Sequence, residues 1–150
     1  TEALFSSINI YPDTYFLDLF AGSGAIGIEA LSRGAKEVIF NDINKDDCKI
    51  IKTNLEKIKE DRKVYNLDYQ LCLKELEGTS FDYIYLDPPY KFNAYDDMFY
   101  YINKYKILNK DGIVIFEVNK NTILKEEYFD MYVYKERKYG ISKLLYYKSR

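Results

Sequence analysis

The sequence predicts an α/β fold with a mostly parallel, doubly wound sheet that ends in an antiparallel C-terminal hairpin. Three observations support this prediction. Short apolar runs alternate with helical patterns between Tyr15 and Val118, and strands that alternate with helices form parallel sheets. A glycine-rich loop joins the first of these strands to a helix. Two final strand-like runs meet near Tyr139-Gly140, which is typical of a hairpin.

Seven segments are expected to be strands because they are short and rich in apolar, β-branched or aromatic residues. They are Tyr15–Phe20, Glu37–Asp42, Lys63–Leu67, Phe81–Leu86, Ile113–Val118, Phe129–Glu136 and Ile141–Lys148. Strand pairing must end at Pro88-Pro89 after the fourth, since proline lacks the N–H that a central strand needs. A turn at Asp111-Gly112 is expected to precede the fifth.

Apolar residues at helical spacing mark the segments between the strands. The expected helices are the end of one within Thr1–Ile10, one that runs through Leu31, one from Asn44 through Ile58, one over Tyr69–Leu76 and one that begins at Asp96. We expect Gly34 to cap the second at its C-terminus and Asn44 to cap the third at its N-terminus. The buried stripe of the third is predicted to be Cys48, Ile51, Leu55 and Ile58. A chain of 150 residues suits one domain.

The composition excludes several kinds of site. The chain has no histidine and its two cysteines form no CxxC pair, so no metal site is expected. No apolar run approaches the ~20 residues of a membrane span and no signal peptide is visible, so we expect no membrane partner. We expect both cysteines to be small buried apolar residues in a reducing cytoplasm, and the protein to be a monomer. The net charge of −2 argues against a generic nucleic-acid binder. The chain begins at Thr1 without methionine, so we expect a preceding segment to be missing.

The loop from Gly22 to Gly27 has the pattern G-x-G-x-x-G between a strand and a helix, and Asp42 follows twenty residues after Gly22. Glycines let the backbone approach a ligand closely, and an acid at the end of the next strand can bind ribose hydroxyls. The pattern therefore predicts an adenosine-containing cofactor, either NAD(P) or S-adenosylmethionine. The alternative is that the glycines only form a tight turn and Asp42 only caps the next helix.

Asp18 favours S-adenosylmethionine over a dinucleotide. It lies four residues before Gly22, where a carboxylate would repel a pyrophosphate but suit the ammonium group of the methionine part. Asp68, at the end of the third strand, could accept a hydrogen bond from the adenine amino group. The alternative for Asp18 is a carboxylate that only organises the N–H groups of the loop.

Asp87-Pro88-Pro89-Tyr90 stands at the end of the fourth strand, at the edge where open α/β sheets bind ligands. The prolines stiffen the loop that carries a carboxylate, a free Pro88 carbonyl and an aromatic ring. These three groups fit a planar group with N–H donors, which the acceptors bind and the ring stacks upon. A rigid turn with a surface tyrosine is the alternative.

Asp87-Pro88-Pro89-Tyr90 resembles motif IV of the amino methyltransferases, and Asp18 to Gly24 resembles their motif I. The whole chain resembles the RsmD family of 16S ribosomal RNA guanine-N2 methyltransferases. Besides both motifs, the resemblance rests on Glu2-Ala3-Leu4-Phe5, on Gly27 to Ala35 and on Lys138-Tyr139-Gly140. Two features depart from the family: its basic N-terminal segment is absent, and Asp42 stands where Glu is more usual.

The resemblance implies a Rossmann-like methyltransferase fold that binds S-adenosylmethionine. It places catalysis on Asp87, Pro88, Pro89 and Tyr90, and cofactor binding on Asp18, Phe20, Gly22, Ser23, Gly24, Gly27, Asp42, Ile43 and Asp68. The partner that it implies is ribosomal RNA, free or within the small subunit or an assembly intermediate. The rival functions are an adenine-N6 DNA methyltransferase, which shares motif IV, an NAD(P) oxidoreductase and a non-enzymatic RNA-binding module.

The C-terminal tail is basic although the whole chain is slightly acidic. Residues 135–150 contain six basic side chains and one acid, Glu136, a local charge of +5. We expect Arg137, Lys138 and Lys143 to contact RNA phosphates. The alternative is a charged hairpin edge that is protected from pairing with other strands.

Overall fold

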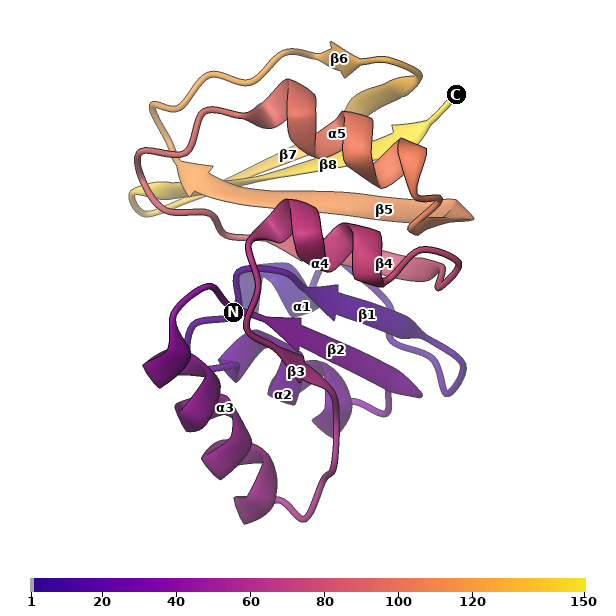
Figure 1. Cartoon of the computed structure of the whole chain (residues 1–150). Coiled ribbons are helices and arrows are strands. Elements are labelled where there is room, and N and C mark those ends of the chain that lie inside the picture. The colour runs from indigo at the N-terminus through magenta and orange to yellow at the C-terminus, as the bar shows by residue number, and fades with distance from the viewer. Residues whose placement is uncertain (1) are drawn as a thin grey trace.

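The computed structural model describes residues 2–150, which form one eight-stranded sheet with helices on both faces (Figure 1). The strand order is β3-β2-β1-β4-β5-β8-β7-β6. Five strands are parallel and lie side by side: β1 (Tyr15–Asp18), β2 (Glu37–Asn41), β3 (Val64–Tyr65), β4 (Phe81–Leu86) and β5 (Leu108–Asn119). The antiparallel end consists of β6 (Glu127–Tyr128), β7 (Met131–Tyr139) and β8 (Ser142–Ser149). The predicted fold class is confirmed.

The helices are α1 (Glu2–Phe5), α2 (Ala25–Ser32), α3 (Lys45–Lys57), α4 (Tyr69–Glu75) and α5 (Tyr95–Lys104). Two apolar clusters separate them into layers. One cluster joins α4 and α5 to one face of the sheet through residues such as Leu73, Met98 and Phe116. The other joins α1, α2 and α3 to the opposite face through residues such as Leu4, Phe40 and Ile51. The molecule is therefore a three-layer sandwich with the sheet in the middle (Figure 1).

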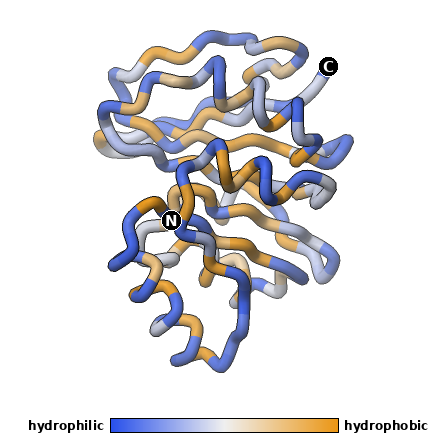
Figure 2. Tube along the Cα trace, viewed as in Figure 1, coloured by the Kyte–Doolittle hydropathy of each residue, from blue (hydrophilic) through white to orange (hydrophobic). Residues whose placement is uncertain are grey.

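The hydropathy pattern explains how the helices lie. Figure 2 shows hydrophobic residues along the central strands, whereas α3 alternates between hydrophilic and hydrophobic residues. Cys48, Ile51 and Leu55 of α3 are buried as predicted, and the Asn44 side chain accepts a 2.9 Å hydrogen bond from the Asp47 N–H as its N-cap. Ile58 follows the last turn and is 44% exposed, so the prediction that it belongs to the buried stripe is wrong. The longest helix has 13 residues, and none within residues 2–150 has the length and apolar character of a bilayer span.

The largest differences from the predicted elements lie in the last third of the chain. The expected turn at Asp111-Gly112 is part of β5, which begins at Leu108. The register between β4 and β5 shifts there, because Phe81 pairs with Leu108 while Tyr83 pairs with Ile113. The two-residue strand β6 has no counterpart among the predicted strands, and β7 begins after Phe129, whose φ is +56°. Phe129 and Asp130 are thus the turn between β6 and β7.

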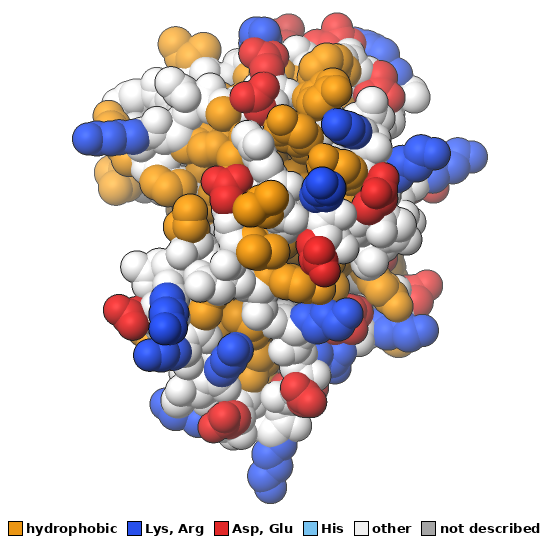
Figure 3. All heavy atoms as spheres, viewed as in Figure 1, with side chains coloured by type: hydrophobic (Ala, Val, Ile, Leu, Met, Phe, Trp, Pro, Cys, Tyr) orange, Lys and Arg blue, Asp and Glu red, His pale blue; other side chains and the backbone are white. Residues whose placement is uncertain are grey.

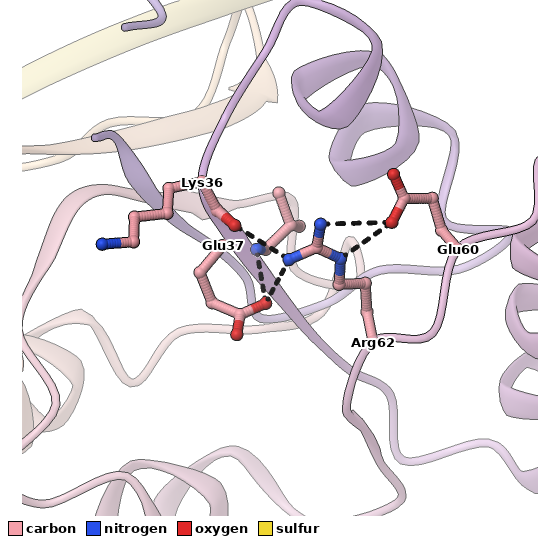
Figure 4. Close-up of polar contacts among 5 residues, drawn as sticks. Lys36, Glu37, Glu60 and Arg62 are labelled. Carbon is pink, nitrogen blue, oxygen red and sulfur yellow. Dashed lines mark hydrogen bonds and ion pairs between the residues drawn. The ribbon is translucent and has the colours of Figure 1, made fainter. Parts of the chain in front are cut away.

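An arginine joins the amino ends of β2 and β3, at the opposite edge of the sheet from the glycine loop. Arg62, in the connection from α3 to β3, donates from Nη1 to the Lys36 carbonyl at 2.8 Å and to Glu37 Oε1 at 3.1 Å (Figure 4). Its Nε donates to Glu60 Oε2 at 3.2 Å. The guanidinium therefore ties the entry of β3 to the start of β2 with a planar fork of donors.

We predict that Gly27→Ala destabilises the fold. A Cβ at this helical position would lie 2.3 Å from Phe40 Cε2 and 2.9 Å from Val38 Cγ1, so α2 would have to move away from β2. Overpacking of this kind costs about 1–3 kcal/mol, which urea unfolding would measure. Ser32→Ala, on the exposed side of the same helix, is the control and should change the free energy of unfolding by no more than about 0.5 kcal/mol. Equal effects of the two variants would contradict the prediction.

Candidate active site

Two cavities lie side by side at the carboxyl ends of the parallel strands. The larger, of about 530 Å³, is lined by Phe20, Ala21, Gly22, Ser23, Ala25, Ile26, Asp42, Ile43, Asp47, Tyr85, Asp87, Pro89 and Glu117. The smaller, of about 210 Å³, is lined by Asp87, Pro88, Pro89, Tyr90, Tyr95, Glu117, Val118, Asn119, Thr122 and Ser142. Asp87, Pro89 and Glu117 belong to both linings and form the boundary between the two spaces.

The glycine loop forms one wall of the larger cavity. Gly22 and Gly24 have φ values of +55° and +83°, which residues with a side chain adopt only at a cost. A Cβ on Gly22 would meet no atom within 4 Å, so this glycine serves backbone conformation rather than close packing. Gly27 has the opposite role, because α2 packs on β2 through it. Gly22, Ser23 and Phe20 therefore lie at the cavity, whereas Gly24 and Gly27 shape the loop behind it.

Asp42 both organises the loop and faces the larger cavity. Its Oδ2 accepts a 2.8 Å hydrogen bond from the Gly22 N–H, and its Oδ1 accepts one of 2.9 Å from the Asn44 N–H. The next residue, Ile43, lines the same cavity and is 71% exposed, an apolar side chain without a covering partner among residues 2–150. The two residues thus offer a carboxylate and an apolar surface next to each other.

Asp18 lies beneath the loop rather than on the cavity wall. The Gly27 N–H donates to its Oδ2 at 3.1 Å, while Oδ1 is buried and has no hydrogen-bond partner among the described residues. Burial, together with the charges of Asp87 and Asp42, raises the pKa of Asp18 to about 7 against the lowering by the Gly27 bond. A buried carboxylate with an unpaired oxygen is costly, and a nearby cation would relieve that cost.

The Asp87-Pro88-Pro89-Tyr90 segment leads directly from β4 to the boundary between the cavities. Burial, and secondarily the charge of Glu117, raises the pKa of Asp87 to about 6. The Pro89 carbonyl accepts a 2.9 Å hydrogen bond from the Phe92 N–H, whereas the Pro88 carbonyl accepts none from the described residues. Tyr90 is 89% exposed, so its ring is open to an incoming ligand. The sequence indicated this arrangement of carboxylate, carbonyl and ring.

Three supporting residues were not singled out from the sequence. The buried Asn41 donates from Nδ2 to the Leu19 and Leu67 carbonyls, at 3.2 and 3.0 Å, and its Oδ1 accepts from the Leu67 N–H at 3.2 Å. It thereby holds the carboxyl ends of three neighbouring strands together. Phe92 anchors the loop after Tyr90, because its ring contacts those of Phe20, Tyr69 and Tyr95 at centroid distances of 5.8, 5.6 and 5.2 Å.

Glu117 is the third of these residues. It lies near the end of β5, and its Oε1 accepts a 2.7 Å hydrogen bond from the Tyr85 hydroxyl on the neighbouring β4. Burial and then the Glu117 charge raise the pKa of Tyr85 well above its usual range, so this hydroxyl keeps its proton and donates. A hydrophobic strand that ends in one acid is a common pattern, and only the fold places Glu117 beside Asp87.

Other residues predicted for the site lie outside both cavities. Asp68 is exposed and caps α4 by accepting a 2.9 Å hydrogen bond from the Gln70 N–H. Arg137 donates to the Ala3 carbonyl and to Ser6 Oγ, at 3.3 and 3.0 Å. Lys143 lies 3.7 Å from Glu136 with a mostly buried side chain, whereas Lys138 is exposed. Of the three tail residues, Arg137 and Lys143 therefore contact other groups of the protein, whereas Lys138 is exposed to solvent.

Comparison with known proteins identifies the family. The family described as Conserved hypothetical protein 95 matches residues 1–148. The chain belongs to this family. The "Putative rRNA methyltransferase YlbH" of Bacillus subtilis is 35% identical over 154 residues, which cover 99% of this chain and 84% of YlbH. "Ribosomal RNA small subunit methyltransferase D" of Haemophilus influenzae is 34% identical over 124 residues, which cover 74% of this chain and 64% of that protein.

A solved structure agrees with these relatives. The conserved hypothetical protein from Streptococcus pyogenes is 29% identical, with a TM-score of 0.89 over 99% of this chain and 94% of that one. The resemblance to the RsmD family that the motifs indicated is confirmed, and with it the class of enzyme, a methyltransferase. In this RsmD-family methyltransferase, both cavities lie at the edge of the sheet where α/β enzymes bind their ligands.

We predict that Asp18→Asn changes how the stability of the free protein depends on pH. A folded-state pKa raised from 3.8 to about 7 means that folding opposes ionisation of Asp18. The contribution of Asp18 to the free energy of unfolding is therefore intact below pH 4, falls as the pH rises to 7, and stays low above that value. Between pH 4 and pH 7, the free energy of unfolding of the Asn variant should rise relative to that of the wild type by up to roughly 4 kcal/mol, at about 1.4 kcal/mol per pKa unit.

Urea unfolding at several pH values would measure this difference. Asp61→Asn, on an exposed connection, is the control and should follow the wild-type dependence on pH. The measurement would refute the assignment if the curves of the Asp18 variant and the wild type ran parallel from pH 4 to pH 8.

Proposed function

We propose that this RsmD-family enzyme transfers a methyl group from S-adenosylmethionine to the exocyclic N2 of a guanine in small-subunit (16S) ribosomal RNA. The observation that carries the proposal is the pair of cavities that meet at Asp87. A methyl donor and an amine acceptor need neighbouring spaces of this kind. The names of the two relatives support ribosomal RNA as the acceptor, and one of them specifies the small subunit.

The larger cavity suits S-adenosylmethionine in volume and in charge. Asp18 would stabilise a cationic ligand through its carboxylate charge beneath the loop, Asp42 would bind ribose hydroxyls, and Ile43 would cover the adenine ring. When bound, S-adenosylmethionine supplies an electrophilic methyl group on a positively charged sulfur. The pyrophosphate of NAD(P) would instead lie close to several carboxylates, which repel it.

The smaller cavity suits the base that accepts the methyl group. Asp87 and the Pro88 carbonyl would accept the two N–H bonds of the amine and orient its lone pair toward the larger cavity. Tyr90 would stack on the base, a contact worth about 1–3 kcal/mol, and the target must be unpaired or flipped to enter. The amine exchanges one proton for the methyl group. Asp87, with a pKa near 6, can accept that proton and pass it to water.

We predict that Asp87→Ala abolishes methyl transfer without abolishing cofactor binding. The variant loses an acceptor at the boundary of the cavities, so the rate constant should fall by at least about 100-fold, the usual effect of a positioned catalytic group. Binding of S-adenosylmethionine, measured by calorimetry, should change only a few-fold. The exposed Asp61→Ala is the control and should retain both properties.

The assay is mass spectrometry of nucleosides after incubation with under-methylated small-subunit RNA, as naked RNA and as assembled particle. Formation of N2-methylguanosine by the wild type supports the proposed acceptor. If the product were N6-methyladenosine, the acceptor would be adenine and not guanine. An Asp87→Ala variant with wild-type activity would show that the tetrad is only a turn.

We predict that Lys138→Ala weakens RNA binding through the loss of one phosphate contact. Lys138 is exposed and, unlike Arg137 and Lys143, makes no side-chain hydrogen bond or ion pair with the described residues, so it can reach a phosphate without breaking such a contact. The slope of log affinity against log salt should decrease by about one. Lys57→Ala, at the end of α3, is the control and should leave the slope unchanged. Identical slopes for both variants would favour a hairpin edge that is merely protected by charge.

A further inference from the structure

Glu117 is the second carboxylate at the boundary of the two cavities, and motif IV does not include it. Its Oε1 is held at 2.7 Å by the Tyr85 hydroxyl, which leaves Oε2 available to a ligand. Its position is rigid for a structural reason. The strand β5 is paired on both sides, with β4 and with β8, so Glu117 rests on a central strand rather than on a loop.

Tyr85 holds Glu117 firmly because its own ring cannot move. The ring is buried and packs against that of Phe16 at a centroid distance of 6.5 Å. Tyr139 is a second neighbour, because burial and then the nearby Glu117 raise the pKa of its hydroxyl, although the hydrogen bond to Glu117 comes from Tyr85. The carboxylate is therefore an oriented acceptor, and its second oxygen can take a donor from a ligand.

The smaller cavity also offers a donor near these acceptors. Asn119 lines it, and its Oδ1 accepts a 2.9 Å hydrogen bond from the Asn121 N–H, so its Nδ2 group is the part left to donate to a ligand. Thr122 and Ser142 add hydroxyl groups to the same lining. The cavity thus combines two carboxylates with at least one amide donor.

The Watson–Crick edge of guanine carries a matching pattern. It presents the N2 amine, then the N1–H donor, then the O6 acceptor, whereas adenine presents an unprotonated N1 next to its amine. A carboxylate at N1 therefore attracts guanine and repels adenine. Asp87 and the Pro88 carbonyl cannot distinguish guanine from adenine, because both bases have an exocyclic amine that these acceptors could bind.

We infer that Glu117 accepts the N1–H of the target guanine while Asp87 holds the N2 amine, and that Glu117 thereby selects guanine over adenine. The inference rests on the proposed function and adds to it the group that reads the identity of the base. In this arrangement Tyr85 is a positioning residue, and Asn119 is the donor for O6.

The test compares guanine with 2-aminopurine, which keeps the N2 amine but has an unprotonated N1 and no O6. The loss of O6 is common to the wild type and the Glu117 variant, so the change in preference between the two proteins reports on N1. The target nucleotide is first mapped with the wild type, and splinted ligation then places each base at that position of the small-subunit RNA. The substrate is naked RNA or assembled particle, whichever the wild type methylates. Wild type should prefer guanine in kcat/KM by about 100-fold or more, because a site built for an N–H donor rejects an analogue that lacks it. Glu117→Gln places an amide donor at N1 and should lower this preference at least tenfold.

The preference, rather than the activity, separates base recognition from a structural role. If Glu117→Gln lowered kcat/KM equally on both RNAs, the preference for guanine would be unchanged. That result would show that Glu117 only supports Tyr85 and would overturn the inference. Tyr85→Phe keeps the carboxylate but loses its anchor, so it should lower kcat on guanine while still preferring guanine. Thermal unfolding and S-adenosylmethionine binding establish that each variant is folded. A wild type that forms no N2-methylguanosine would overturn the proposed function itself, whatever the preference.

Discussion

The concentration of negative charge at the carboxyl edge of the sheet is the constraint on which the site depends. Asp18, Asp42, Asp87 and Glu117 come from four neighbouring strand ends, and like charges in a partly buried space repel one another. Backbone N–H groups of the glycine loop offset part of this cost at Asp18 and Asp42, and the Tyr85 hydroxyl does so at Glu117. Burial first, and the neighbouring carboxylates second, raise the pKa values of Asp18 and Asp87, which shows that part of the cost remains. A site with such a residual cost is prepared for a cationic ligand and for N–H donors.

The surrounding structure keeps this arrangement from collapsing. Asn41 joins the ends of three strands through its side-chain amide, and Gly27 brings α2 close to β2 so that the loop lies over Asp18. Phe92 fixes the segment after Tyr90 within a cluster of aromatic rings. Figure 3 shows apolar side chains gathered on the face that carries α4 and α5. The charged groups thus depend on apolar packing and on one buried amide. Their own mutual interactions are unfavourable.

The sequence predicted the parts of the site that local patterns specify. The glycine loop, the paired prolines and Asp42 each have a recognisable spacing, and the parallel order of the strands followed from the alternation with helices. Glu117 and Asn41 have no such spacing, because their roles arise from contacts between strands far apart in the chain. The start of β5 was misplaced for a related reason. Asp111-Gly112 has the local chemistry of a turn, but pairing with β4 continues past it after a shift of register. Basic residues likewise look alike in sequence, although Arg137 and Lys143 are held by the protein itself and Lys138 is not.

The proposed division of roles between β4 and β5 would explain how one motif can serve enzymes that act on different bases. In the proposed function, the loop after β4 would bind an exocyclic amine, a group that guanine and adenine share, so it can specify the chemistry of the acceptor but not its identity. The identity has to be read at the neighbouring ring nitrogen, which is a donor in guanine and an acceptor in adenine. The parallel pairing of Tyr85 with Ile115 places Glu117 two residues further along β5, where it meets the Tyr85 hydroxyl beside Asp87. A rigid side chain at the end of this second strand is therefore placed to reach that ring nitrogen in the proposed complex. The register between the two strands, rather than the motif alone, then decides which base fits.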